Sequence, residues 1–345
     1  MLHSSTYRLP PSNDHPYVVT AKRYTIGDAG GSGHNASEGI TLILGHCIGM
    51  FKESWEPVLE DLFEIEAGQS STPIFEAWSF DCPHHGQDGN INEPVLLADP
   101  TQTFPGDAYG RAIGRFLTAD ERQGAQVDFS KHNLVALGHS VGASSLIWLH
   151  HSPEFPVRFQ SFILVEPMLN AVHARDISAC WPAYIAFAYQ RRDTWESSEA
   201  AFQDMLKTMP YMSWDRRAIA SFVTYGLREH PAASFSIEPF SGVALACSRM
   251  AEAAVYRGTY QFAHGMVSVL ACISKDVPIH FIWGAVEDSL TQGLRDALMY
   301  KCGIVMASHR WIPDAGHLVP LQAPGATAAV IDKLLRTTKH TGSRP

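Results

Sequence analysis

The feature that most constrains the fold of this chain is a serine between two glycines at the end of an apolar stretch, in NLVALGHSVGASS at residues 133–145. The aliphatic residues that lead into it predict a buried strand. Gly138 and Gly142 flank Ser140 in the pattern G-x-S-x-G, which is typical of a nucleophile on a sharp turn between a strand and a helix. Larger side chains at the two glycine positions would collide with nearby backbone. The alternative is an ordinary strand–turn–helix unit with a buried serine.

Apolar runs elsewhere in the chain predict further strands. With residues 133–139, the predicted strands are 17–25, 40–46, 74–81, 159–167, 277–284 and 307–313. Most of the later runs are almost continuously apolar, which is typical of parallel strands buried on both faces. Helical patterns at 55–65 and 291–302 lie between them, and the Gly- and Ser-rich stretch 27–39 predicts a turn. We therefore expect an α/β fold, with a mostly parallel central sheet flanked by helices.

The strand–helix alternation is missing from residues 168–275. Helical patterns dominate there, at 181–195, 197–209, 214–227 and 250–262. A stretch of this length is too long for a loop in a compact domain. It predicts a mostly helical cap inserted after the sixth strand, so that residues 1–167 and 276–345 form the core and residues 168–275 form the cap.

A serine hydroxyl needs a neighbouring base to act as a nucleophile at neutral pH. We expect this base to be His317, because it follows the last predicted strand in the turn-forming sequence DAGHLVP. The chain has 17 histidines, so the residue type alone does not single out His317, and the prediction rests on its position after the last strand. A structural loop histidine is the alternative. Asp314 is expected to shape the turn and not to orient the imidazole.

Two positions compete for the carboxylate that orients the base. Glu166 ends the very apolar run FILVEP, where a carboxylate without a partner would be costly. Glu287 and Asp288 follow the next strand, in a more polar stretch that matches the commoner placement of such an acid. We favour Glu166 and keep Asp288 and Glu287 as alternatives.

An acyl-transfer site also needs backbone N–H groups that stabilise a negatively charged oxygen. Val141, directly after the serine, is expected to supply one. The loop GHCIGMFKESWEP after strand 40–46 is expected to supply the other, from an amide near Cys47 or Ile48, where Gly49 permits an unusual backbone. Cys47 as the nucleophile is a weaker alternative, because no strand–turn–helix pattern surrounds it.

Several longer motifs accompany these residues. They are GHCIGMFKESWEPVLEDL (45–62), WSFDCPHHGQDGNIN (78–92), GHSVGASS (138–145), LVEPML (164–169), RRDTWESSEAAF (191–202), VTYGLR (223–228) and DAGHLVP (314–320). Together they resemble the α/β-hydrolase family, and within it a branch of fungal secondary metabolism. That branch includes hydrolases of Alternaria toxin biosynthesis and the acyl-CoA hydrolase of the mycophenolic acid pathway. The resemblance covers nearly the whole chain.

The resemblance implies roles for individual residues. It makes Ser140 the nucleophile, His317 the base and Glu166 the acid after the sixth strand, although the acid here is Glu and not Asp. The spacing from His46 to Trp55 makes Ile48 the second oxyanion donor. No metal ion or organic cofactor is implied.

The expected activity is hydrolysis of an ester-like acyl bond, in a thioester, ester or lactone of a bulky apolar molecule of secondary metabolism. Side chains that we expect to contact this small-molecule acyl substrate are Cys47, His139, Trp181 and Tyr184, with Phe187, Tyr189, Trp195 and Tyr211 as further candidates. Acyl transfer, cyclisation or C–C bond hydrolysis by the same residues stays an alternative. A non-catalytic ligand-binding relative is a more remote one.

The composition argues against other classes of partner. The net charge is −9 and no cluster of Lys and Arg offsets it, so a nucleic-acid surface is not expected. No apolar run is long enough to predict a membrane span. Six scattered cysteines without a C-x-x-C pair favour reduced thiols and the cytoplasm. The final Ser-Arg-Pro is a poor match to a peroxisomal tripeptide, so the peroxisome is the second choice, and a homodimer stays open.

Overall fold

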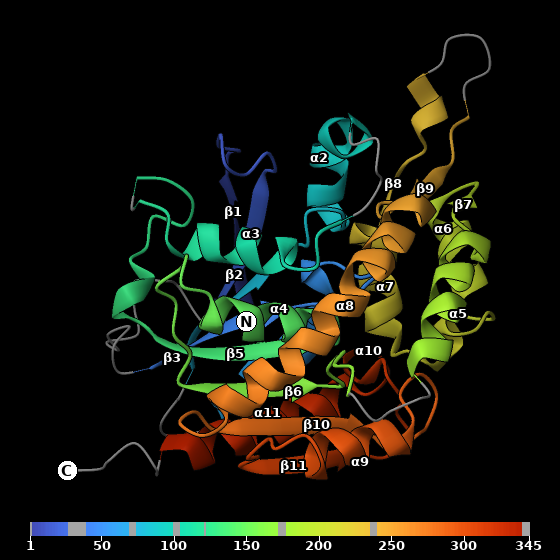
Figure 1. Ribbon diagram of the computed structural model, residues 1–345. Helices are drawn as coiled ribbons and strands as arrows, with labels where there is room; N and C mark the ends of the chain where they lie inside the picture. The colour runs from blue at the N-terminus through green and yellow to red at the C-terminus, as the bar shows by residue number, and fades with distance from the viewer. Residues whose placement is uncertain are drawn as a thin grey trace.

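The computed structural model describes residues 2–26, 39–68, 74–98, 104–120, 122–171, 177–234 and 240–339. Within these residues an eight-stranded sheet runs through the molecule in the order β1-β2-β4-β3-β5-β6-β10-β11 (Figure 1). Its strands are β1 (Leu2–Leu9), β2 (Val19–Ile26), β3 (Ile40–Gly45), β4 (Ile74–Phe80), β5 (Asn133–His139), β6 (Ser161–Val165), β10 (Ile279–Gly284) and β11 (Ser308–Ile312). β2 pairs antiparallel with both β1 and β4, and the other neighbours are parallel.

All seven strands predicted from apolar runs are present in the sheet. The parallel strands β3, β5, β6 and β10 are almost wholly buried, which explains their continuous apolar sequences. The strand β1 was missed, because it lies at the sheet edge and most of its side chains are exposed, so that its sequence LHSSTYRL carries no apolar run. The predicted turn 27–39 lies, except for Gly39, outside the described residues.

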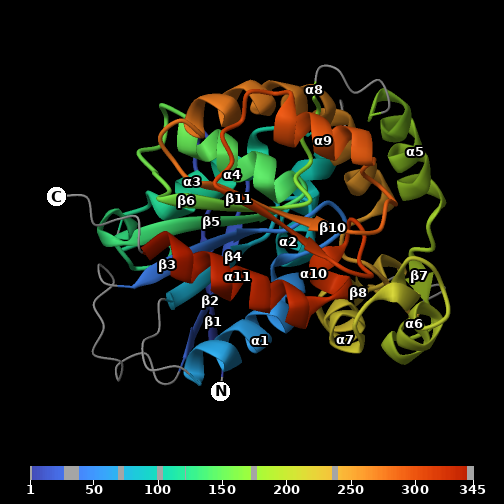
Figure 2. The ribbon, with the colours of Figure 1, turned by 90° about the horizontal axis from the view of Figure 1, so that it is seen from below.

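Helices cover both faces of the sheet. Helices α1 (Glu56–Ala67) and α11 (Pro324–Lys339) pack together on one face, whereas α3 (Ala108–Leu117), α4 (Val141–His151), α8 (Arg249–Ile273) and α9 (Gln292–Tyr300) cover the other (Figure 2). Each layer has its own apolar cluster against the sheet, and the sheet separates the two. Two further helices, α2 (Gly86–Ala98) and α10 (Val319–Gln322), follow loops at the sheet edge where the parallel strands end.

The segment between β6 and β10 contributes no strand to the main sheet in the part of the chain that the structure describes. It contains α5 (Ile177–Gln190), α6 (Ser198–Met205), α7 (Arg216–Tyr225) and α8, which agree with the four predicted helical segments. It also contains a small sheet in the order β7-β9-β8, formed by β7 (Thr194–Trp195), β8 (Leu227–Glu229) and β9 (Val243–Leu245). The sequence did not predict this sheet, because strands of two or three residues are too short to show a period.

Helix α8 joins this segment to the main sheet. It packs against α5 and also against α4, and its residues Val267, Leu270 and Ile273 belong to the main apolar cluster. Helices α5 and α6 lie beside the sheet at one end (Figure 1). The division into a core and a cap at residues 168–275 stays a prediction. No described helix combines the length and the apolar character that a membrane crossing needs.

Candidate active site

Ser140 occupies the turn between β5 and α4. Its backbone has φ 54° and ψ −118°, a strained conformation for a residue with a side chain. A Cβ atom on Gly138 would overlap the backbone of Ala143, and one on Gly142 would overlap the backbone of Gly45 in β3. The structure therefore explains both glycines as the sequence predicted: each permits a backbone approach that any side chain would block.

The imidazole of His317 lies beside this serine. His317 follows β11, and its Nε2 is 3.0 Å from Oγ of Ser140. Both residues are buried, with His317 9 % exposed. Asp314 takes a positive φ of 56° in the loop before His317, as expected for a residue that shapes this turn. The geometry allows the imidazole to accept the proton of the hydroxyl.

Glu166 lies on the other side of the same imidazole. Its Oε2 is 3.4 Å from Nδ1 of His317, at the outer limit of a hydrogen bond. Its Oε1 accepts the N–H of Gly284 at 2.8 Å and pairs with Nη2 of Arg295 at 2.9 Å. Glu166 is fully buried and has a positive φ of 43°. Its three neighbours come from a strand, a helix and a loop, and they surround a carboxylate that water does not reach.

The competing carboxylate, Asp288, contacts the same histidine at a different group. It accepts the backbone N–H of His317, at 2.8 Å and 3.1 Å to its two oxygens. Nε2 of His139 donates to the backbone carbonyl of His317 at 2.8 Å. Asp288 and His139 thus hold the main chain of His317, while Glu166 faces its ring. Glu287 is exposed to solvent.

The loop after β3 brings a second backbone segment to the serine. Ile48 lines the same cavity as Ser140, and no described residue accepts a hydrogen bond from the amide of Ile48 or of Val141. Gly49 has a φ of 80°, and its N–H donates to Nε2 of His85 at 2.9 Å. Burial lowers the pKa of His85 well below its usual value, so its ring is neutral and can accept this bond.

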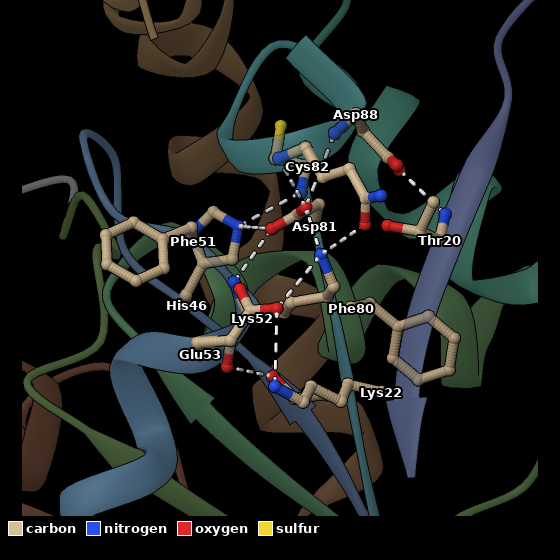
Figure 3. Close-up of polar contacts among 12 residues, drawn as sticks. Thr20, Lys22, His46, Phe51, Lys52, Glu53, Phe80, Asp81, Cys82 and Asp88 are labelled. Carbon is tan, nitrogen blue, oxygen red and sulfur yellow. Dashed lines mark hydrogen bonds and ion pairs between the residues drawn. The ribbon is translucent and has the colours of Figure 1, made fainter. Parts of the chain in front are cut away.

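A buried polar network fixes this loop to the loop after β4 (Figure 3). His46 donates from Nδ1 to the carbonyl of Cys47 at 2.7 Å and accepts the N–H of Cys82 at Nε2 at 3.0 Å, a pattern that requires a neutral ring. Burial lowers the pKa of His46 to about 4, in agreement with that pattern. Asp81 accepts the backbone N–H and the ammonium of Lys52, at 2.7 Å and 2.9 Å. Buried hydrogen bonds therefore join the two loops beside Ile48.

A cavity of about 500 Å³ opens next to the serine. Most of its lining is apolar: Cys47, Ile48, Met50, Met168, Ala183, Tyr184, Phe187, Met209, Pro210, Tyr211, Trp214, Tyr256 and Leu318. Ser140, His317 and Asp288 also line it. One wall carries an ion pair, because Nη1 of Arg191 lies 2.7 Å from Glu252. The cavity suits a bulky apolar group next to the serine and the imidazole.

The lining includes Cys47, Tyr184, Phe187 and Tyr211 among the side chains predicted to contact substrate. Two other predicted contacts, His139 and Trp181, are not part of it. His139 is used on the backbone of His317, and the indole N–H of Trp181 donates to the carbonyl of Tyr256 at 2.7 Å. Tyr189 and Trp195 do not line the cavity either.

The thiol of Cys47 is fully buried, and burial raises its pKa far above the usual range. The thiolate that a cysteine nucleophile requires is therefore disfavoured. Among the described residues, no group of three or more His, Cys, Asp or Glu side chains is arranged to hold a metal ion.

The fold and the site can now be compared with those of known protein families. The model of the alpha/beta hydrolase family matches residues 42–330, so the chain belongs to that family, as its motifs predicted. Curated relatives are the type I acyl-CoA thioesterases mpaH of Penicillium roqueforti, 27% identical over 200 residues, and mpaH' of Penicillium brevicompactum, 25% identical over 198 residues. In both cases the match covers 56% of this chain and only 41% of the relative.

Solved structures agree on the fold. The peroxisomal alpha-beta-hydrolase Lpx1 of Saccharomyces cerevisiae has a TM-score of 0.73 at 15% identity, over 100% of this chain and 91% of that one. The thioesterase domain from the curacin biosynthetic pathway has a TM-score of 0.62 at 13% identity, over 97% of this chain and 99% of that one.

Several residues around the site were missed by the sequence analysis. They are His85 and Asp81, which bind the loop after β3, Arg295 behind Glu166, and the contact of His139 with the loop that carries His317. Each lies on a different element from the group it contacts, so no local pattern connects the two. The one available signal was the cluster of His and Asp in FDCPHHGQD directly after β4.

Proposed function

We propose that this chain is a serine hydrolase that cleaves an ester or thioester bond of a bulky, mainly apolar acyl compound. Ser140 is the nucleophile, His317 the general base and Glu166 the carboxylate that orients the base. The observation that supports these roles most strongly is the imidazole that lies 3.0 Å from the serine hydroxyl and 3.4 Å from a buried carboxylate, at the wall of the cavity.

The proposed reaction has two steps. Oγ of Ser140 attacks the acyl carbon while Nε2 of His317 takes its proton, and the protonated imidazole then passes that proton to the leaving alcohol or thiol. The amides of Ile48 and Val141 stabilise the oxyanion in each step. Water, activated by the neutral imidazole, attacks the acyl-enzyme and releases the acid and free Ser140.

The substrate class follows from the cavity and from the relatives. An apolar cavity of about 500 Å³ accommodates a large acyl group, and the curated relatives are named acyl-CoA thioesterases. A thioester is therefore the first candidate and an ester the second, since one oxyanion hole serves both. Residues 168–275 act as the cap in this proposal, because Tyr184, Tyr211 and Tyr256 of the cavity wall belong to that segment.

A direct test uses the purified chain with acyl-CoA thioesters and aryl esters of increasing acyl length, together with a fluorophosphonate probe. We expect probe labelling and substrate turnover in the wild type, and neither in Ser140→Ala. Hydrolysis in ¹⁸O-labelled water should place one labelled oxygen in the released acid, whereas acyl transfer or cyclisation would not. Equal turnover by wild type and Ser140→Ala would refute the proposal.

A further inference from the structure

The carboxylate of Glu166 has a cationic partner on the side away from His317. Nη2 of Arg295, on α9, lies 2.9 Å from Oε1 of Glu166, and both side chains have an exposed fraction of 0%. Oε2 of the same carboxylate faces Nδ1 of His317. Ser140, His317, Glu166 and Arg295 therefore form a continuous line of polar contacts, in which the two oxygens of Glu166 contact different partners.

This arginine is poorly satisfied for a buried cation. Nη2 also donates to the carbonyl of Val286 at 3.3 Å, and the guanidinium lies 5.6 Å from the centre of the Trp311 ring. Within the described part of the chain, Nε and Nη1 of Arg295 are buried without a hydrogen-bond partner. Buried ion pairs are often no more stable than apolar residues of the same volume, and unpaired N–H groups add to the cost. Stability is thus a weak explanation for Arg295, and its position directly behind Glu166 suggests another.

We propose that Arg295 is a positioning residue that keeps the carboxylate of Glu166 turned so that Oε2 faces His317. The inference rests on the proposed function. The N–H of Gly284 assists on the same oxygen, at 2.8 Å. With Oε1 occupied by two donors, Oε2 is the oxygen left to receive the N–H of the imidazole. Held in this orientation, Oε2 can stabilise the imidazolium that forms when Ser140 loses its proton.

The other titratable groups near Glu166 and Arg295 form hydrogen bonds with the backbone. His139 on β5 donates to the backbone of His317, and burial lowers its pKa to about 3, so it stays neutral. Tyr184 on α5 donates to the carbonyl of Ser289 at 2.6 Å, and burial raises its pKa. Asp288, on the loop after β10, accepts the backbone N–H of His317. Among the described residues, Arg295 is thus the cation that directly contacts the carboxylate of Glu166.

The experiment measures kcat and kcat/KM against pH for wild type, Arg295→Met and Arg295→Lys. The substrate is one that the wild type hydrolyses and Ser140→Ala does not. We expect Arg295→Met to lower kcat about 10–100-fold with less effect on KM. The acidic limb of its pH profile should move up by about one pH unit, because loss of a buried positive charge beside the site makes proton uptake there more favourable. Arg295→Lys, which keeps the charge, should recover part of kcat and return the limb toward the wild-type position.

A matched control separates positioning from general stability. Nη2 of Arg336 on α11 lies 2.8 Å from Glu66 on α1, another fully buried carboxylate, in the helix layer that covers the opposite face of the sheet. Arg336→Met should lower the free energy of unfolding and leave the pH profile unchanged. If Arg295→Met behaves like this control, with wild-type kcat and an unmoved acidic limb, Arg295 is structural and the inference is wrong.

A double variant covers the case in which Arg295→Met does not fold. Arg295→Met combined with Glu166→Gln removes both buried charges, so it should be recovered folded and should be as active as Glu166→Gln alone. A further tenfold loss in the double variant would contradict an action through Glu166. The outcomes for Ser140→Ala separate the two proposals. If Ser140→Ala loses turnover and labelling and one of the contrary results above is also found, only the role of Arg295 is overturned. Full activity of Ser140→Ala overturns the proposed function.

Discussion

Asp288 contacts His317 at the backbone and not at the imidazole. Its carboxylate accepts the N–H of His317 at 2.8 Å, and a Cβ on the neighbouring Gly316 would overlap that carboxylate. The ring of His317 is left to face Ser140 on one side and Glu166 on the other. Two carboxylates thus contact one histidine, and their different contacts predict different effects on replacement.

Glu166→Gln is expected to lower kcat about 10²–10⁴-fold, because the neutral amide no longer stabilises the imidazolium. Asp288→Asn should lower kcat much less, since it weakens the hold on the loop without changing the partner of the ring. Steady-state kinetics of the two variants, compared with the exposed Glu287→Gln, provide the measurement. A larger loss in Asp288→Asn than in Glu166→Gln would assign the orienting carboxylate to Asp288.

The glycines of the serine turn should tolerate no side chain. Gly138→Ala and Gly142→Ala place a Cβ atom into the backbone of Ala143 and of Gly45, so each should destabilise the fold by about 1–3 kcal/mol or more. Gly265→Ala is the matched control: Gly265 lies inside α8 with nothing within 4 Å of an added Cβ. It should stabilise the chain by about 0.5–1 kcal/mol. Urea unfolding curves measure all three, and wild-type stability of Gly142→Ala would contradict the packing described here.

The loop after β3, which carries the proposed oxyanion donor Ile48, should depend on the neutral ring of His85. His85→Leu removes the acceptor of the Gly49 N–H and should lower kcat about tenfold to hundredfold, less than the loss of an oxyanion donor itself. KM should change little, because the ring supports the loop and does not line the cavity. His85→Gln supplies an amide oxygen in its place and should keep more of kcat. Equal kcat in the leucine variant and wild type would show that the loop holds its shape without this bond.

Stability should fall on mild acidification because buried histidines are neutral in the folded chain. Burial lowers the pKa of His280 on β10 to about 4, whereas an unfolded histidine titrates near 6.5. Below pH 6.5 the unfolded chain binds a proton at His280 that the folded chain does not. The contribution of His280 to the free energy of unfolding is therefore fully present above pH 6.5. It is lost as the pH falls from 6.5 to about 4, at up to about 1.4 kcal/mol per pH unit.

The measurement is urea unfolding at pH 7, 6 and 5. His280→Asn should reduce the dependence of the unfolding free energy on pH, and His264→Asn, at an exposed position on α8, should keep the wild-type dependence. An unchanged slope in His280→Asn would mean that His280 takes up its proton in the folded chain as readily as in the unfolded chain.

The features that the sequence determined by itself are local. Continuous apolar runs predicted the buried strands, because a strand covered on both faces cannot place polar side chains on either. The pattern around Ser140 predicted its sharp turn, because the steric demand acts on residues two positions away. The edge strand β1 was not predicted because most of its side chains are exposed, and the small sheet β7-β9-β8 was not predicted because its strands have only two or three residues.

Tertiary structure decided which of these groups meet. Glu166 and Asp288 both follow strands of the sheet, and the direction of each side chain, not its place in the sequence, determines that one faces the imidazole and the other the backbone of His317. In the same way Arg295 reaches Glu166 from a helix 129 residues away (295 − 166). The energy of a buried charge depends on neighbours within a few ångströms. Here those neighbours come from separate strands, helices and loops, which only the folded chain brings together.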